Sequence, residues 1–184
     1  MTKYLERKKF VGFLLLSLAF FIIFVMSSTD ANAYSLNGRK LPSKSFAYKW
    51  GDNLSESSSV IGDAFRSATG DWYSAVSINL FYTTAAKSTF NSYHVSSSSE
   101  YGYTTTYFNT STGIVNYYEA YVNGSNSNIT KNNVARSVAV HELGHPMGLA
   151  DLQSGTAVMN QQRNRESIYI PQTDDKNGIS AIGY

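Results

Sequence analysis

The sequence predicts an α+β domain over residues 34–184, in which strands alternate with helices and a last helix lies at the C-terminus. Short runs rich in β-branched and aromatic residues recur between Ser45 and Asn123, as is typical of strands. Two other segments repeat apolar residues at three- and four-residue steps, as amphipathic helices do. About 150 residues are enough for one domain with a hydrophobic core.

The first predicted elements are a strand, a helix and a second strand. Ser45–Trp50 (SFAYKW) is the first strand. A helix over residues 57–75 follows, although Gly70 within it weakens the pattern. Ser77–Thr83 (SINLFYT) is the strand after that helix.

Residues 84–128 are rich in Tyr, Ser, Thr and Asn and contain three more β-prone runs. These runs are Thr89–Val95, Gly102–Phe108 and Ile114–Asn123, and we expect Gly102–Phe108 to be an edge strand. Asn109–Gly113 (NTSTG) has the composition of a turn between the last two.

The next helix carries the segment His141-Glu142-Leu143-Gly144-His145 and should begin at a cap provided by Thr130 or a nearby Asn. On a helix, His141 and His145 stand one turn apart on the same face, so both imidazoles can reach one tetrahedral Zn²⁺. Glu142 lies about 100° round the helix from His141, close to a metal-bound water without occupying a ligand position.

The chain must then turn back toward these side chains. Pro146 lacks the N–H that would bond to the Glu142 carbonyl, so it favours an early helix stop. Gly148 supplies the positive φ that reverses the chain, and Asp151 can then provide a third, oxygen ligand. The pattern therefore indicates a hydrolytic zinc site.

The spacing H-E-x-x-H-x-x-G-x-x-D resembles the metzincin metalloproteases, although their usual third ligand is His where this chain has Asp151. Ser154–Met159 fits the metzincin Met-turn, with Met159 beneath the metal. The segment Ile170–Ile182, with Asp174-Asp175 followed by Gly178-Ile179, resembles the matrixin C-terminal helix, capped by Thr173 or Asp174. The resemblance covers residues 45–184.

A matrixin-like fold implies a twisted, mostly parallel sheet with an active-site helix, a Met-turn and a C-terminal helix. It also implies an endopeptidase with one catalytic Zn²⁺, held here by His141, His145 and Asp151, with Glu142 as general base. Calcium is a family property, but residues 76–128 contain no Asp, so the usual calcium-loop carboxylates are not evident. The Pro-x-Tyr wall typical of vertebrate matrixins is absent after Met159, so cleavage specificity is not implied.

Two other classes of function stay open. One is a zinc-binding but inactive relative that binds extracellular peptides, although inactive relatives commonly lose the base at Glu142. The other is an exported β-rich wall or sugar-binding module in which the motif is accidental. Met159 could equally be a core residue, and Asp151 a solvated loop residue. We expect His94, the only other His, to be a surface strand residue without a metal role.

Residues 1–33 have the pattern of a signal peptide. A basic start that includes Lys3 and Arg7 precedes the apolar run Phe10–Met26, and Ala31-Asn32-Ala33 is an A-x-A cleavage site. The alternative is an uncleaved N-terminal anchor, because the apolar run approaches the length of a membrane span. Either reading places the domain, residues 34–184, outside the cytoplasm, and cleavage makes it secreted.

The composition of the chain limits the classes of binding partner that it can be expected to have. The chain has a net charge of +2, but residues 34–184 contain 11 basic and 11 acidic residues. This balance predicts no nucleic-acid partner and no acidic membrane surface. No cysteine is present, so neither a disulfide framework nor a cysteine-switch propeptide is expected. The predicted partners are protein or peptide substrates of a monomer.

Overall fold

The computed structural model of the protein describes residues 34–54 and 59–184. The predicted signal peptide, residues 1–33, lies outside the described residues. Among the helices that the structure describes, none combines the length and the apolar character needed to span a bilayer.

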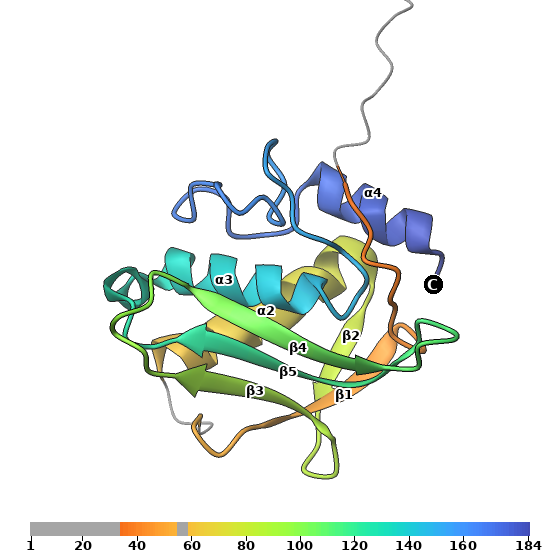
Figure 1. The fold of residues 1–184 in the computed structure, drawn as a ribbon, viewed down its shortest axis with the longest axis horizontal. Coiled ribbons are helices and arrows are strands. Elements are labelled where there is room, and N and C mark those ends of the chain that lie inside the picture. Colours follow the sequence, from red (N-terminus) through yellow and green to blue (C-terminus); the bar gives the residue numbers. More distant parts are fainter. Residues whose placement is uncertain (1–33, 55–58) are drawn as a thin grey trace, which may run out of the picture. The chain divides into compact units, whose positions relative to one another are not determined.

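A five-stranded sheet in the order β2-β1-β3-β5-β4 forms the base of the described part (Figure 1). The strands are β1 (Ser45–Trp50), β2 (Asn79–Tyr82), β3 (Ser88–Tyr93), β4 (Gly102–Phe108) and β5 (Val115–Asn123). All neighbours pair in parallel except β4, which is antiparallel to β5. The predicted mostly parallel sheet is confirmed, and so is the place of Gly102–Phe108 at its edge.

The predicted strand positions are correct, with small differences at their ends. β1 and β4 have the predicted bounds, and β2, β3 and β5 are one to three residues shorter than the predicted strands. β2 begins late because Ser77 adopts a left-handed conformation, φ 60°, to end the preceding helix. In the β4–β5 hairpin, Gly113 has φ 71° and its N–H donates to the Asn109 carbonyl, as a turn there requires.

Helices α2 (Val60–Val76) and α3 (Asn132–Gly144) lie on the same face of the sheet and pack against each other (Figure 1). The N-terminus of α2 is capped by the Ser59 hydroxyl, which accepts a hydrogen bond from Gly62 N–H at 3.0 Å. Its buried side chains include Phe65, which stacks on Phe90 of β3 with ring centroids 4.5 Å apart. Burial of such rings stabilises the packing of α2 against the sheet.

The predicted cap of α3 is wrong. Residues Ser127–Thr130 form a 3₁₀ turn, and the Thr130 hydroxyl donates back to the Ser127 carbonyl within it. The extended residue before the helix is therefore Lys131, whose side chain makes no capping bond. Tertiary packing compensates: Trp72 of α2 donates from Nε1 to the Val140 carbonyl at 3.0 Å, and both residues are completely buried.

Residues 145–172 form no regular helix or strand and lead to α4 (Thr173–Ile182). The predicted caps Thr173 and Asp174 are also wrong, because Gln172 is the N-cap and forms a capping box with Asp175. On the inward side of α4, Ile179 is buried and Ile182 packs against the core. The irregular segment before α4 returns the chain to the two histidines at the C-terminal end of α3.

Candidate active site

Helix α3 presents the two histidines at its C-terminal end. His141 lies in the last turn, and His145 follows the helix with helical backbone angles, φ −61° and ψ −51°. The rings therefore stand on the same side, with centroids 5.0 Å apart and planes at 87°. The helix stops at Gly144, as the Pro at position 146 predicted.

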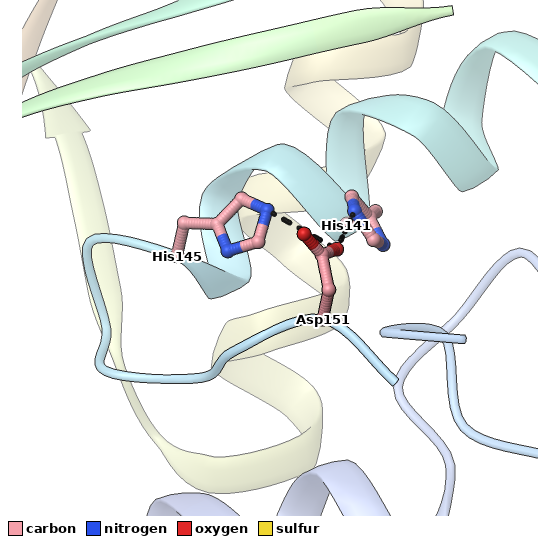
Figure 2. A group of neighbouring side chains, drawn as sticks. All are labelled: His141, His145 and Asp151. Atoms are coloured by element: carbon pink, nitrogen blue, oxygen red, sulfur yellow. Dashed lines mark ion pairs between the residues drawn. The ribbon is translucent and has the colours of Figure 1, made fainter. Parts of the chain in front are cut away.

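A tight reversal after His145 brings Asp151 to the same place. Gly148 has φ 109°, and a Cβ there would lie 2.4 Å from the Arg39 carbonyl, so both conformation and space require glycine. Asn37 holds the reversal by donating from its side-chain amide to the His145 and Leu149 carbonyls. The result is the group of His141, His145 and Asp151 in Figure 2, which the sequence predicted.

The geometry of this group fits a zinc ion. His141 Nε2 and His145 Nε2 lie 3.0 and 3.7 Å from Asp151 Oδ1, and the ligand atoms all fall within 4.8 Å of one another. Tetrahedral zinc with bonds of about 2.0–2.1 Å needs donor atoms roughly 3.3 Å apart. Two imidazoles and one carboxylate also leave a fourth position for water, which is the donor set of a catalytic site.

Backbone carbonyls orient both imidazoles toward this centre. His141 Nδ1 lies 3.0 Å from the Val158 carbonyl, and His145 Nδ1 lies 3.0 Å from the Leu149 carbonyl. A carbonyl can only accept, so each Nδ1 carries the proton and each Nε2 has a free lone pair. Burial lowers the pKa of His141 to about 4, which keeps its ring neutral at neutral pH.

Glu142 lies beside this group and not within it. Its side chain is buried, and Thr104 Oγ1 of β4 lies 2.9 Å from both its Oε2 atom and its backbone carbonyl. Burial raises the pKa of Glu142 to about 8, and the Thr104 bond partly offsets that rise. A buried carboxylate held in this way can accept and release a proton. A bound dication would lower its pKa by direct attraction.

A cleft of about 390 Å³ opens over these side chains. It is lined by Asn37, Arg39, Gly102, Tyr103, Thr104, His141, Glu142, His145, Ala150, Asp151 and Gln161. Three of these residues belong to the edge strand β4. The cleft therefore joins the candidate metal centre to a strand edge at which another chain could pair.

The segment 154–159, the predicted Met-turn, contacts His141 and the C-terminal end of α3. Met159 is buried, and its Sδ lies so close to Gly144 that a Cβ there would be 2.5 Å away. The buried Asp175 carboxylate accepts hydrogen bonds from the N–H groups of Val158 (2.8 Å), Met159 (3.2 Å) and Gln172 (2.7 Å). Helix α4 therefore anchors the turn whose carbonyl, at Val158, orients His141.

Several residues of the site were not predicted from the sequence. Arg163 is 5% exposed, donates from Nε to Ser137 Oγ and from Nη2 to the Ser137 carbonyl, and places Nη1 3.2 Å from His141 Nδ1. Thr104, Asp175 and Asn37 were also missed as supporting residues. The Asp-Asp pair was a usable signal for Asp175, whereas an isolated Thr or Arg has none. His94 is exposed, as predicted, but it follows the end of β3 at Tyr93 and is not a strand residue.

Comparisons with known proteins give the family. A search among curated proteins found no match. The model of one protein family, described as matrixin, matches residues 42–183, which include α2, α3, the sheet and α4. The matched family is one of zinc metalloproteases, in agreement with the fold and the grouped donor atoms. This chain therefore belongs to the matrixin family.

Proposed function

We propose that this matrixin is an active zinc endopeptidase in which His141, His145 and Asp151 hold the catalytic ion and Glu142 is the general base. The observation that carries the proposal is the meeting of these three donor groups, with the buried Glu142 beside them. The family model supports the zinc protease class.

The chain's own groups account for proton transfer and for substrate placement. Glu142 accepts a proton from the attacking water and delivers it to the amine nitrogen of the departing product. Zinc, when bound, supplies Lewis-acid activation of the water and of the peptide carbonyl. Thr104 keeps the Glu142 carboxylate directed at the cleft, while the free edge of β4 receives an extended substrate by main-chain pairing.

The test combines metal analysis with peptide hydrolysis. The purified protein should contain one zinc per chain and cleave casein, and a chelator should remove both properties. Glu142→Ala should keep the zinc and the fold but lower kcat/KM by about 10²- to 10⁴-fold. Asp52→Ala, at an exposed carboxylate after β1, is the matched control and should leave kcat/KM unchanged.

Ligand variants test the metal assignment separately. His141→Ala, His145→Ala and Asp151→Ala should each lose tight zinc binding, whereas His94→Ala should not. Zinc that survives Asp151→Ala but is lost in His94→Ala would overturn the third ligand. A zinc-loaded protein that binds peptides but cleaves none would instead be the inactive relative.

We also propose that residues 1–33 are removed and that residues 34–184 act outside the cell as a monomer. The basic, apolar and A-x-A segments of the sequence support this. N-terminal sequencing of protein from the culture medium should begin at Tyr34, and light scattering should give a monomer mass. Protein found only with the membrane and starting before Tyr34 would show a retained anchor.

A further inference from the structure

A second cavity, of about 370 Å³, lies next to the cleft and shares Gly102, His141, Glu142 and Gln161 with it. Six residues line this second cavity and not the cleft: Ser99, Glu100, Tyr101, Val138, Arg163 and Arg165. We call it the arginine pocket. Because Glu142 lines both spaces, a group in the arginine pocket lies next to the place where a substrate bond would react.

Arg163 carries a buried positive charge that no carboxylate contacts directly. Its donors go to neutral oxygens, namely Ser137 Oγ, the Ser137 carbonyl and the Asn160 carbonyl, at 2.8–3.0 Å. Among the described residues, no ion pair involves this guanidinium. Buried charges are normally paired, so this arrangement is costly unless an anion approaches.

Arg165 adds a second cation to the same cavity. Its guanidinium stacks on the Tyr101 ring, 3.9 Å from the centroid, and Nη2 donates to the Gln161 carbonyl at 3.0 Å. Its Nε is buried and has no hydrogen-bond partner in the described part of the chain. Stacking fixes the plane of the guanidinium, which is the arrangement that favours recognition of a carboxylate.

The acidic groups of this cavity leave the two arginines without a close counterion. Glu142 attracts both guanidinium groups but is bonded to Thr104, and it is the proposed base. Glu100 is exposed, and its carboxylate accepts from Ser98 Oγ. Arg163 and Arg165 also repel each other. An anion bound beside both would offset this repulsion, so its binding is more favourable.

We propose that the arginine pocket binds the side chain of a substrate residue flanking the cleaved bond and prefers a carboxylate there. This inference rests on the proposed peptidase function and adds the substrate class. The two guanidinium groups would form charge-assisted hydrogen bonds with a Glu or Asp side chain of the peptide. A neutral Gln of the same shape lacks the charge, and a Lys would be repelled.

The experiment uses quenched fluorescent peptides that differ only in one residue, Glu, Gln or Lys, on either side of one cleaved bond. At one of these two positions, kcat/KM for the Glu peptide should exceed that for the Gln peptide by at least about tenfold, because a guanidinium binds a charged carboxylate more strongly than a neutral amide. Arg165→Glu should reverse the order and favour Lys. Arg165→Lys should retain a preference for Glu, and Arg66→Gln, on α2, should retain the full ratio.

Thermal melting confirms that each variant is folded before its ratio is compared. Equal rates for Glu and Gln at both flanking positions would overturn this inference and leave the peptidase function intact. A preference for Glu that is unchanged in folded Arg165→Glu would overturn the assignment to this pocket. A zinc-loaded protein that cleaves no peptide would overturn the proposed function, and this inference with it.

Discussion

The two histidines and Asp151 reach the candidate metal centre from regions that are built differently. The histidines belong to α3 and its end, whose packing against α2 and the sheet buries apolar side chains. Asp151 belongs to residues 146–172, which are held by turns, by Gly148 and by hydrogen bonds to the Asp175 carboxylate. Packing of a regular helix therefore positions the histidines, whereas the irregular segment that carries Asp151 depends on a glycine reversal and specific polar contacts in addition to its buried apolar residues.

The largest expected effect is a core truncation in the first region. Phe65→Ala removes a completely buried ring that stacks on Phe90, and should cost about 3–5 kcal/mol of unfolding free energy. The loss should be similar with zinc and with chelator, because the ring does not touch the site. Denaturant unfolding under both conditions measures it, and a loss that appears only with zinc would contradict the division into two regions.

The second prediction breaks the polar region. Asp175→Asn removes a buried carboxylate that accepts three backbone N–H bonds, and should cost about 2–3 kcal/mol. Zinc affinity should fall as well, because the Val158 carbonyl that orients His141 loses its anchor. The neighbouring Asp174→Asn is the control and should change stability by less than about 0.5 kcal/mol. Zinc titration and thermal melting of the pair compare them.

A smaller effect is expected within the first region, where β4 meets Glu142 of α3. Thr104→Val removes the hydroxyl that lies 2.9 Å from Glu142 Oε2, and should lower kcat/KM by about fivefold to tenfold, equivalent to about 1 kcal/mol. Thr106→Val, on the same strand, is the control, because the Thr106 hydroxyl is buried with no hydrogen-bond partner among the described residues. Equal losses in the two variants would show that Thr104 acts only through packing.

The smallest effect at neutral pH is expected for Tyr118, whose buried hydroxyl has no hydrogen-bond partner in the described part of the chain. Burial raises its pKa above the ordinary value, so the folded state keeps the phenol neutral. Below pH 10 the phenol is protonated in both the folded and the unfolded chain, so it causes no loss of stability. As the pH rises above 10, only the unfolded chain releases the proton, and the free energy of unfolding falls. Tyr118→Phe should be nearly neutral at pH 7 and should weaken the alkaline loss of stability, as unfolding at pH 7 and pH 10.5 measures.

The same division explains what could be predicted from the sequence. Apolar periodicity and β-prone composition placed the five strands, α2 and α3, because the β1 run and the Phe65 face of α2 bury apolar side chains at regular steps. Helix α4 was predicted from its resemblance to the matrixin C-terminal helix, and the 3₁₀ turn Ser127–Thr130 was not predicted. The spacing from His141 to Asp151 predicted which groups meet, since a helix turn and one glycine reversal connect them. The N-caps Lys131 and Gln172 were missed, because the exact start of each helix depends on the path of the chain just before it. The 3₁₀ turn before α3 is one example.

Supporting residues were harder to predict because their partners are distant in sequence. Thr104 meets Glu142 across 38 positions, and Arg163 meets Ser137 across 26. No local pattern marks such pairs, because they depend on the pairing of β4 with β5 and on the path of the chain after Met159. The arginine pocket was missed for the same reason, as its walls come from residues 99–102, α3 and residues 161–165.

The three proposed ligands lie within eleven residues of one another along the chain, and this has a consequence for how metal couples to folding. Closing so short a segment costs little chain entropy, so an unfolded polypeptide can also chelate zinc through His141, His145 and Asp151. Any affinity of the denatured ensemble is subtracted from the stabilisation that the ion gives to the native state. Excess zinc should therefore raise the melting temperature less than the native-state Kd alone implies.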